Sequence, residues 1–372
     1  MSADPVAAVR ARYPRVAITH EWLTVPGGSE QVVMAMLDVF PQAELFTSVY
    51  DPAPWPPQIT ERPVHASFLN RIPRAPRIYP KLLPLMDAAF RSFDLRGFDL
   101  VLSSNHACAK NVRAPRGSLH VCYCHTPMRY VWDPAFLRDE ALGPVGRLIA
   151  PALLAHVRRQ DLKASRNPHA YLANSSFVAD RIGRFYGREA TVLHPPVDVD
   201  RLLGTPRQDG DHYLFLSRLV PYKRADLAVA ACSRLGRPLK VVGDGRAYEA
   251  VRAAAGPTVE LLGRVPDAEL AQLLAAARAL LFPAEEDFGI VPVEAQAAGV
   301  PVIAYGTGGA RDSVIDGTTG LLFPEQTVDS LCEAIVRFEA RDWPEAPLRE
   351  HAARFHPRRF REGLARHLLA FG

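Results

Sequence analysis

Long apolar segments and paired cysteines are both missing from this chain. No stretch of the 372 residues approaches the roughly 20 consecutive apolar residues that a membrane-spanning helix requires. Residues 1–15 lack the apolar core of a secretory signal, so we expect a cytoplasmic protein. Hydrophobic residues make up 48% and charged residues 23% of the chain, which is typical of a globular protein in water.

The five cysteines are odd in number and scattered through a long chain, which argues against a disulfide framework. Cys122 and Cys124 directly precede His125, but the second cysteine pair of a zinc site is absent. This pattern favours buried structural thiols over metal ligands.

Positive charge is too weakly concentrated to indicate a nucleic-acid partner. The net charge is +4, and no nucleic-acid-binding module is recognisable. Residues 71–97, however, mix basic with apolar side chains, which suits either an anionic membrane surface or a core-facing helix with a solvated charged side. The second interpretation is favoured. The basic residues of the segment are Arg71, Arg74, Arg77, Lys81, Arg91 and Arg96.

Short apolar strands alternate with helices in both halves of the chain, which predicts parallel α/β layers. The predicted strands of the first half are 15–23, 43–49, 99–105, 118–127 and 170–176, with helices at 27–40 and 145–165. Those of the second half are 213–217, 239–242, 259–262, 279–282 and 301–304, with helices at 224–235, 246–255, 267–278 and 291–299.

A chain of this length exceeds what one hydrophobic core usually supports. Residues 191–213 are rich in proline and glycine, and we place the linker there, between domains 1–195 and 205–345. Two doubly wound domains in tandem predict a ligand cleft between the carboxyl ends of two sheets.

The segment EEDFGIVPVE at 285–294 lies where a strand should end and a helix begin. A glycine at such a helix entry lets a ligand approach backbone N–H groups, and a carboxylate there can accept hydrogen bonds from sugar hydroxyls. Taken alone, Glu286 and Glu294 are also explained as ordinary residues of a helix N-terminus. Their context favours a site.

Arg218 and Lys223 follow the first predicted strand of the second half, where an arginine fork and a lysine point charge could hold a diphosphate. The glycine turns GDG at 243–245 and GTGG at 306–309 follow other strands of the same sheet. Four such features at one edge of one predicted sheet indicate a binding site for a diphosphate-linked sugar.

The second half resembles the donor-binding domain of retaining family-four glycosyltransferases with the GT-B fold. The resemblance rests on SRLVPYKR, VVGDG, LLGRV, EEDFGIVPVEAQAAGVPVIA and GTGG, with the two glutamates in the family's E-x7-E spacing. In the first half, HEWLTVPGGSE resembles the N-terminal glycine loop of the same family. SSNHACAKNV, CYCHTPMRYVWD and LANSSFVADRI resemble bacterial mannosyltransferases of polysaccharide assembly. The implied fold is α/β, with two Rossmann-like, doubly wound domains that face each other across a cleft.

The resemblance also implies roles for individual residues. Arg218 and Lys223 would bind the diphosphate and stabilise the leaving group, Glu286 would contact the donor sugar, and His125 would be an active-site histidine near that sugar. The implied donor-binding residues are Gly27, Gly28, Gly243, Gly263, Arg264, Val265, Asp287, Phe288, Gly289, Ile290 and Glu294.

On the acceptor side, polar and aromatic residues at predicted strand ends are candidates, although they could equally serve as caps and packing groups. They are His20, Glu21, Trp22, Ser104, His106 and Lys110. The family further implies that residues 346–372 form a C-terminal helix that crosses back to the first domain.

The implied reaction is same-face transfer with retention and without an obligatory metal or other cofactor. GDP-mannose is the first expected donor and a UDP-sugar the second. The expected acceptor is a glycan or lipid-linked glycan, met at the inner face of the cell membrane. Only five of the 44 basic residues are lysine, which is typical of a GC-rich bacterial source.

Other classes explain the motifs less well. A dinucleotide-dependent oxidoreductase would need G-x-G-x-x-G after its first strand, whereas the first loop here is GGSE. A non-catalytic nucleotide-sugar-binding protein would not need the cations, both glutamates and His125. A GT-B-fold nucleotide-sugar epimerase stays open, because it would bind a similar donor.

Overall fold

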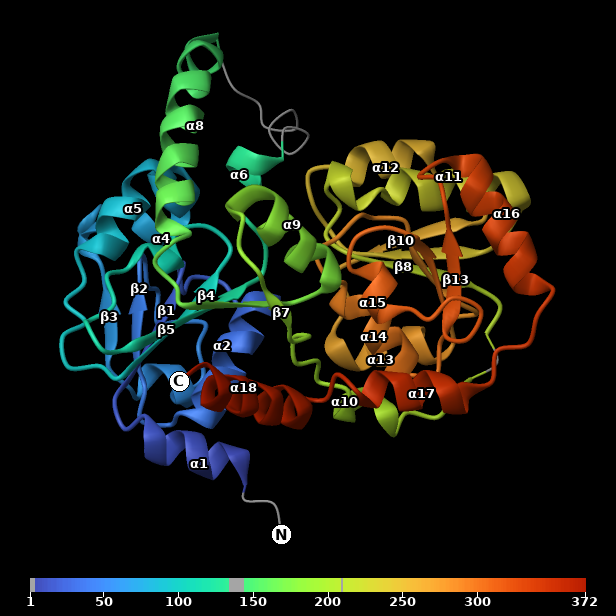
Figure 1. Cartoon of the computed structure of the whole chain (residues 1–372). Coiled ribbons are helices and arrows are strands. Elements are labelled where there is room, and N and C mark those ends of the chain that lie inside the picture. The colour runs from blue at the N-terminus through green and yellow to red at the C-terminus, as the bar shows by residue number, and fades with distance from the viewer. Residues whose placement is uncertain (1–3, 134–143, 209) are drawn as a thin grey trace. The chain divides into compact units, whose positions relative to one another are not determined.

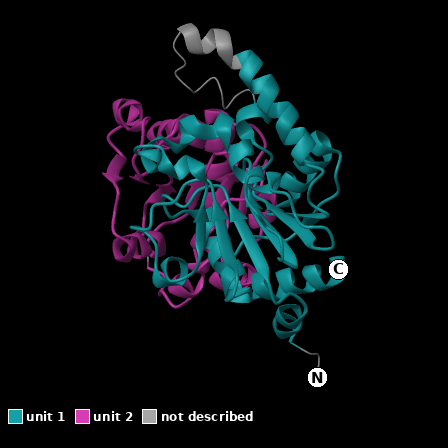
Figure 2. Ribbon diagram, turned by 90° about the vertical axis from the view of Figure 1, so that its left-hand side faces the viewer, with its two compact units in different colours: residues 1–196, 357–372 teal, residues 197–356 magenta. Residues whose placement is uncertain are grey.

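The computed structural model describes residues 4–133, 144–208 and 210–372 (Figure 1). The chain divides into two compact units, coloured separately in Figure 2. Unit 1 comprises residues 1–196 and 357–372, and unit 2 comprises residues 197–356. Each unit is an α/β layer structure with one parallel sheet, which confirms the predicted fold class of two Rossmann-like domains.

Among the described residues of unit 1, seven strands form a parallel sheet in the order β3-β2-β1-β4-β5-β6-β7. The strand order reverses between β1 and β4, and ligands of doubly wound sheets bind at such a reversal, beyond the carboxyl ends of the strands. The strands are β1 (Val16–His20), β2 (Glu44–Thr47), β3 (Val64–Ala66), β4 (Leu100–Asn105), β5 (Leu119–Cys124), β6 (Ala170–Ala173) and β7 (Thr191–Val192).

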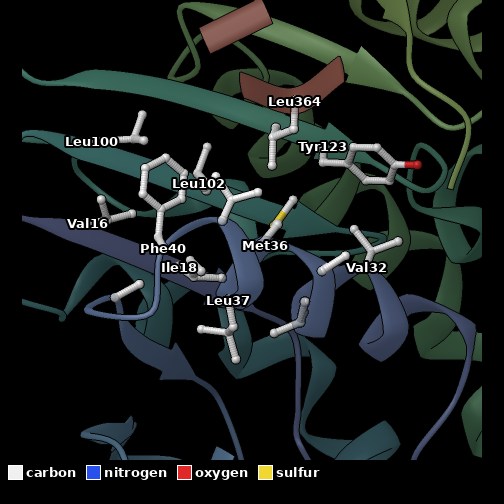
Figure 3. Packing of buried hydrophobic residues seen from close by; sticks show 14 of the residues in the cluster. Val16, Ile18, Val32, Met36, Leu37, Phe40, Leu100, Leu102, Tyr123 and Leu364 are labelled. Atoms are coloured by element: carbon white, nitrogen blue, oxygen red, sulfur yellow. The ribbon is translucent and has the colours of Figure 1, made fainter. Parts of the chain in front are cut away.

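The core of unit 1 forms where α2 (Gly28–Val39) packs on the sheet (Figure 3). Val32 and Met36 lie one helical turn apart, so they share the buried face of α2. Figure 3 shows them against Ile18 of β1 and Leu102 of β4. Each such buried side chain contributes about 1.5–3 kcal/mol relative to exposure.

Among the remaining helices of unit 1, α9 begins and ends at residues suited to helix termini. Ser175 caps α9, because its hydroxyl accepts a hydrogen bond from the Val178 N–H at 3.1 Å, and Gly187 ends the helix in the left-handed region at φ 62°. The helices are α1 (Pro5–Arg12), α3 (Pro57–Thr60), α4 (Ala75–Ile78), α5 (Leu83–Arg91), α6 (Arg129–Trp132), α8 (Pro144–Ala164), α9 (Ser176–Tyr186) and α18 (Pro357–Phe371). Short 3-10 turns are η1 (Phe68–Arg71), η2 (Tyr79–Leu82) and η3 (Ala109–Asn111).

The basic and apolar segment 71–97 turns most of its apolar side chains inward. Met86 and Phe90 are fully buried, and Ile72 and Ile78 pack against the same cluster. Its basic residues Arg71, Arg74, Arg77 and Lys81 are exposed. This arrangement is the one expected of a core-facing segment with a solvated charged side.

Among the described residues of unit 2, six strands form a parallel sheet in the order β10-β9-β8-β11-β12-β13, with the reversal between β8 and β11. The strands are β8 (Tyr213–Leu216), β9 (Leu239–Val242), β10 (Val259–Gly263), β11 (Leu280–Phe282), β12 (Val302–Tyr305) and β13 (Gly320–Phe323). The helices are α10 (Asp200–Leu203), α11 (Ala225–Leu235), α12 (Tyr248–Ala254), α13 (Asp267–Ala275), α14 (Ile290–Ala297), α15 (Ala310–Ser313), α16 (Val328–Glu339) and α17 (Glu345–Ala353), with a 3-10 turn η4 (Pro221–Lys223).

The sequence patterns did not indicate the strands β3, β7 and β13, or the helices α1, α3, α6, α9, α10, α15 and α16. The first two strands are only three and two residues long and lie at the outer edges of their sheet, where little burial pattern develops. β13 follows Thr318 and Thr319 and begins at Gly320. A Cβ on Gly320 would lie 1.9 Å from the carbonyl oxygen of Val302, so the close approach of these two backbones requires glycine there.

The C-terminal region differs from the single helix expected over 346–372. It forms two helices, and α17 belongs to unit 2 while α18 belongs to unit 1. Arg349 of α17 donates to the carbonyl oxygens of Leu203 and Ala297, at 2.7 and 2.8 Å, and so closes the open ends of α10 and α14. α18 lies beside α1 and α2 (Figure 1), and its Phe360 packs edge-on against Tyr123 of β5.

Candidate active site

Loops that follow the strands of unit 2 gather at the carboxyl edge of its sheet. Arg218 and Lys223 follow β8, and Glu286 follows β11, so these side chains come from the two strands that flank the reversal. Gly243 follows β9, and Gly263 ends β10. Because parallel strands end at the same edge, residues up to 68 positions apart in the sequence, Arg218 and Glu286, come together here.

The glycines of GDG allow two backbones to approach closely. A Cβ on Gly243 would lie 1.8 Å from the carbonyl oxygen of Ser217, and one on Gly245 would lie 2.4 Å from that of Leu219. Their φ angles of 136° and 154° are also ones that other residues rarely adopt. The Gly243 N–H donates to the Gly263 carbonyl oxygen at 2.7 Å, which joins the turns after β8, β9 and β10.

The glycines of GTGG play the same role beside EEDFG. A Cβ on Gly309 would lie 2.2 Å from the Cα of Phe288, and the Gly309 N–H donates to the Glu286 carbonyl oxygen at 2.7 Å. Gly308 adopts φ +66°, and a Cβ there would lie 2.4 Å from the same carbonyl oxygen. The GTGG turn therefore holds the backbone of 286–288 in place.

Lys223 and Glu286 form an ion pair in which the Lys223 Nζ contacts Glu286 Oε1. Both side chains are largely buried, which strengthens their attraction relative to that in water. Arg218 is exposed and lies in the turn after β8, which packs against GDG. The pair places a cation and a carboxylate acceptor within reach of one bound ligand.

Glu294 lies in the second turn of α14 and forms an ion pair with Arg201 of α10, with Nη2 and Oε1 3.5 Å apart. Burial raises the pKa of Glu294, opposed by the charge of Arg201. The sequence interpretation missed Arg201, which falls in the predicted linker with no motif to distinguish it.

The other predicted donor-binding residues surround the start of α14 and the end of β10. Gly289 precedes α14 with φ +90°, Phe288 is buried, and Ile290 is the first residue of the helix. Asp287 is partly buried in the same turn. Arg264 is exposed and lies 3.7 Å from Asp244 of GDG, and Val265, which follows it, is partly buried.

In unit 1, predicted residues gather at the carboxyl edge of the sheet, beside its reversal. His20 ends β1, Ser104 lies near the end of β4, and their Cα atoms are paired in the strand register. His125 directly follows β5, and its N–H donates to the Asn105 carbonyl oxygen at 2.8 Å. Gly27 and Gly28 are exposed at the start of α2, where N–H groups of the first turn are available to an anion.

Hydrogen bonds connect these residues into a chain. His20 Nε2 lies 3.0 Å from Glu30 Oε1, and His20 Nδ1 lies 3.0 Å from Ser104 Oγ. Ser104 Oγ lies 2.8 Å from His125 Nε2. Glu30 is the glutamate of the GGSE motif, and the sequence analysis predicted no functional role for it.

Burial and neighbouring charges perturb both ends of this chain. Burial lowers the pKa of His125 well below its ordinary value, helped by His106 and His20, so its imidazole is neutral. Burial raises the pKa of Glu30, but the hydrogen bond from His20 and the charges of His20 and His106 outweigh it and lower that pKa to about 2. Glu30 is therefore ionised at neutral pH.

Glu21, predicted as an acceptor-side residue, is instead a buried cap. Its side chain is fully buried, and its carboxylate oxygens accept hydrogen bonds from successive backbone N–H groups of the loop after β4. These bonds occupy the accepting positions of the carboxylate, so an acceptor sugar could bind it only by breaking the hydrogen bonds that hold the loop. The donors are His106 at 3.1 Å, Ala107 at 2.7 Å, Cys108 at 2.8 Å and Ala109 at 3.0 Å.

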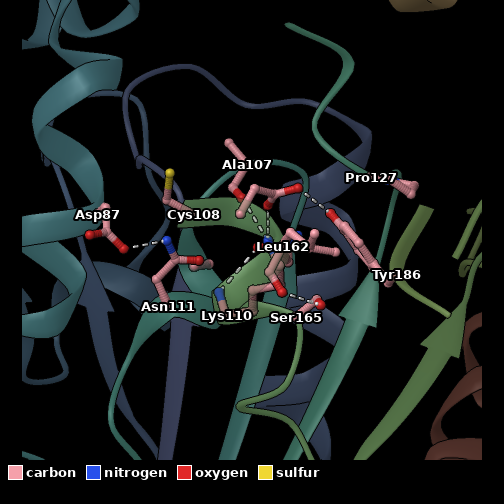
Figure 4. Close-up of polar contacts among 12 residues, drawn as sticks. Asp87, Ala107, Cys108, Lys110, Asn111, Pro127, Leu162, Ser165 and Tyr186 are labelled. Carbon is pink, nitrogen blue, oxygen red and sulfur yellow. Dashed lines mark hydrogen bonds and ion pairs between the residues drawn. The ribbon is translucent and has the colours of Figure 1, made fainter. Parts of the chain in front are cut away.

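Lys110 also differs from its predicted role, because its side chain is fully buried. Figure 4 draws it among its polar contacts, which include Ala107. Its Nζ pairs with Asp161 of α8 and donates to the Ala107 carbonyl oxygen at 3.1 Å. Tyr186 and Trp132 donate to the other oxygen of Asp161, at 2.8 and 2.6 Å. The charge of Asp161 outweighs burial and raises the pKa of Lys110, so this residue is a structural cation.

The remaining acceptor-side candidates divide by exposure. His20 and Ser104 are fully buried, so direct contact with an acceptor is not available to them. Trp22 and His106 are partly exposed and pack edge-to-face, with ring centroids 4.7 Å apart. These two rings are the candidates that remain open to a ligand.

All five cysteines are buried and free of disulfides, and burial raises the pKa of Cys122 well above its ordinary value. Within the described ranges, no cluster of three or more histidine, cysteine, aspartate or glutamate side chains could hold a metal ion. No helix in the part of the chain that the structure describes is long and apolar enough to cross a membrane.

Comparison with family models places both halves of the chain among glycosyltransferases. Residues 26–201 match the model described as Glycosyltransferase Family 4, and residues 210–340 match Glycosyl transferases group 1.

Curated relatives match over part of their length. D-inositol 3-phosphate glycosyltransferase of Streptomyces scabiei is 30% identical over 275 residues, which cover 64% of this chain and 59% of that protein. An uncharacterized glycosyltransferase of Methanocaldococcus jannaschii is 29% identical over 180 residues, which cover 46% of this chain and 50% of that protein. The chain thus spans little more than half of these relatives.

Solved structures match over nearly the whole chain. Sucrose-phosphate synthase of Thermosynechococcus elongatus has a TM-score of 0.71 at 20% identity, with 96% of this chain and 100% of that one covered. HepE of Anabaena, in complex with UDP and glucose, has a TM-score of 0.66 at 17% identity, with 95% and 99% covered. These similarities establish the GT-B fold.

Proposed function

We propose that the chain is a GT-B glycosyltransferase of the group 1 and family 4 type, which transfers a hexose, with retention, from a nucleotide-sugar donor to a glycan or lipid-linked glycan. The observation that carries the proposal is the Lys223–Glu286 ion pair at the reversal of the unit 2 sheet. It combines a cation for a diphosphate with a carboxylate for sugar hydroxyls.

Each group of the site has a place in the reaction. Arg218 and Lys223 neutralise charge on the diphosphate as the bond between its oxygen and the sugar C1 breaks. The acceptor hydroxyl bonds to C1 from the same face, and its proton passes to the departing phosphate oxygen. Glu286 holds the sugar hydroxyls, and the backbone N–H groups of 288–290 orient the sugar.

Donor binding rearranges the charges of the site. In the structure Lys223 pairs with Glu286, and Arg201 pairs with Glu294. A diphosphate would become the partner of Lys223 and leave Glu286 to accept hydrogen bonds from hydroxyls. Glu294, held by Arg201, would accept from the ribose.

We propose GDP-mannose as the first donor, because the motifs CHTPMRYVWD and EEDFGI resemble those of mannosyltransferases. A UDP-sugar is the second candidate, favoured by the similarity to Anabaena HepE, which was solved with UDP and with UDP-glucose. Arg218 and Lys223 would supply the positive charge that a diphosphate needs, so we propose that transfer needs no obligatory metal.

Contact with the inner face of the cell membrane is part of the proposal for a lipid-linked acceptor. Arg71, Arg74, Arg77 and Lys81 are exposed, and so is Leu85 of α5. Exposed cations with a single apolar side chain suit reversible contact with anionic lipid, which high salt would weaken.

The function is tested by incubating the protein with GDP-mannose, UDP-glucose or other nucleotide sugars and a glycan acceptor, with and without a chelator. We expect transfer from GDP-mannose, a product whose anomeric configuration by NMR matches the donor, and no loss of rate with the chelator. Failure to transfer a sugar from any of these donors, or an epimerised donor formed without any acceptor, would refute it.

Variants locate the site. Lys223→Ala and Glu294→Ala should each lower kcat/KM at least about tenfold, equivalent to about 1.4 kcal/mol. The matched controls are Arg252→Ala and Glu249→Ala, which remove one exposed ion pair on α12 of the same unit. Equal effects of site and control variants would show that the assignment is wrong.

A further inference from the structure

Glu21 of unit 1 and Glu294 of unit 2 are both carboxylates with little exposure to water, but their oxygens are occupied to different extents. Four backbone N–H groups donate to Glu21 at 2.7 to 3.1 Å. Among the residues that the structure describes, the one partner of the Glu294 carboxylate is the Arg201 guanidinium, at 3.5 Å. Charge-assisted hydrogen bonds are shorter, at about 2.7–2.9 Å. An ionised carboxylate has about four accepting positions, so Glu294 keeps positions for the donors of a ligand.

The Arg201 guanidinium lies between two carboxylates from different helices. Its Nη2 is 3.5 Å from Glu294 Oε1 of α14, and its Nη1 is 3.4 Å from Oδ2 of Asp267, the first residue of α13. A planar guanidinium, with its donors in a fixed fork, suits this bridging position better than the compact charge of a lysine. Because both ends face carboxylates, Arg201 acts on a ligand through Glu294, and the diphosphate is left to Arg218 and Lys223.

The helix that carries Arg201 is fixed to the helix that carries Glu294. α10 and α14 are in contact (Figure 1), and Leu202 is fully buried in the cluster that also contains Val293 of α14. Arg349 of α17 donates to carbonyl oxygens at the carboxyl ends of both helices. The Arg201 side chain is itself 34% exposed, so its place depends on the anchored backbone of α10.

The charges around Glu294 make a cation necessary there. Burial raises the pKa of Glu294, the charge of Arg201 opposes that rise, and the charges of Asp198 and Asp267 add to it. Asp198 and Asp267 are exposed, so water stabilises their charges. Without Arg201, Glu294 would be the carboxylate that takes up a proton most readily. A protonated carboxyl accepts fewer and weaker hydrogen bonds than a carboxylate.

We propose that Arg201 is a positioning residue that holds the Glu294 carboxylate in the orientation in which it accepts hydrogen bonds from the two ribose hydroxyls of the donor nucleotide. The place of the ribose beside Glu294 rests on the proposed function, whereas the dependence of Glu294 on Arg201 rests on their pairing. Arg201 is then a determinant of the choice for ribonucleotides, because a nucleotide that lacks these hydroxyls gains nothing from the ion pair.

The test compares nucleotides that differ only in the ribose hydroxyls. Calorimetric titration of the full chain with GDP and with 2′,3′-dideoxy-GDP gives the ratio of their dissociation constants, and UDP with its dideoxy form is titrated in the same way. We expect the wild type to bind the ribonucleotide at least about tenfold more tightly than the dideoxy form, since hydrogen bonds to a charged group are lost. Glu294→Ala should bring this ratio to about one. Arg201→Met should lower it at least about threefold and leave the affinity for the dideoxy form within about twofold.

The affinity for the dideoxy form separates positioning from general support of the fold. A residue that only supported unit 2 would weaken the binding of both nucleotides by the same factor. Arg201→Lys, which keeps the charge, should recover part of the ratio, and Arg201→Met should lower it no further in a Glu294→Ala background. Arg252→Met, which removes an exposed ion pair on α12, should bind both nucleotides as the wild type does. Equal weakening of both by Arg201→Met, or an unchanged ratio, would overturn the proposal.

The pH dependence of the ratio is a second readout. Removing the guanidinium raises the pKa of Glu294 further, so its carboxylate takes up a proton at a higher pH in Arg201→Met than in the wild type. The ratio should therefore fall at a higher pH in the variant as acid is added. Taking the ratio cancels the titration of the diphosphate, which both nucleotides share. Coincident pH profiles in the variant and the wild type would contradict the proposal.

Binding and transfer fail separately. Ribose discrimination that depends on Arg201, in a protein that transfers no sugar, would support the positioning role and refute the proposed function. Sugar transfer by a protein that binds both nucleotides equally would refute the positioning role alone. Absence of binding to either ribonucleotide would refute both.

Discussion

Replacing Glu21 with glutamine should destabilise unit 1 without weakening substrate binding. The carboxylate accepts from backbone N–H groups at 2.7 to 3.1 Å in a fully buried setting. In Glu21→Gln the amide oxygen can accept from the three backbone N–H groups that donate to Oε1 in the wild type. The Cys108 N–H, which donates to Oε2, then faces the N–H of the amide. One unpaired buried N–H costs about 1–3 kcal/mol, and loss of charge from the other bonds adds about 1–3 kcal/mol.

The expected total is about 4 kcal/mol, which lowers Tm by about 10 °C for a unit of this size. Thermal and urea unfolding measure it, and hydrogen exchange should show faster exchange of the amides at 106–109. Glu44→Gln, a half-exposed carboxylate of the same unit, is the matched control and should change stability by less than about 1 kcal/mol. If Glu21→Gln unfolds like the control and instead raises KM for the acceptor, the cap interpretation is refuted.

Three further outcomes follow from particular contacts. Lys110→Met should cost about 3–5 kcal/mol because it leaves Asp161 charged and buried, and adding Asp161→Leu should recover part of that loss in urea unfolding. The pKa of Glu30 falls from 4.5 to about 2, so its ionisation stabilises the fold by about 3 kcal/mol above pH 4.5 and that contribution disappears as the pH falls toward 2. The stability difference between wild type and Glu30→Gln should therefore shrink with acid, and a constant difference would contradict the assigned pairing. Gly309→Ala should displace the turn at Phe288 and lower donor affinity in calorimetry, whereas an unchanged affinity would show that the turn tolerates the Cβ.

The structure brings together the predicted donor-side residues Lys223 and Glu286, whereas it buries Glu21 and Lys110, which were predicted on the acceptor side. Glycine turns and charged residues that follow predicted strands can be recognised from a few consecutive residues. Parallel strands then bring such turns to one edge of the sheet, whatever the details of packing. Lys223 and Glu286 are found together for that reason. Glu21 and Lys110 follow predicted strands too, but their burial depends on how the loop after β4 folds, which no local pattern records.

The linear sequence by itself determined the α/β class, the donor-side motifs, most strands and some of the helices, because periodicity and glycine punctuation act over a few residues. Only the tertiary structure decided which polar groups are buried and which pair. His20 meets Ser104 across 84 positions and Arg201 meets Glu294 across unit 2, since strand register and helix packing set those distances. The partners of a charged group depend on through-space distance and on exclusion of water, and neither quantity is encoded by neighbours in the chain.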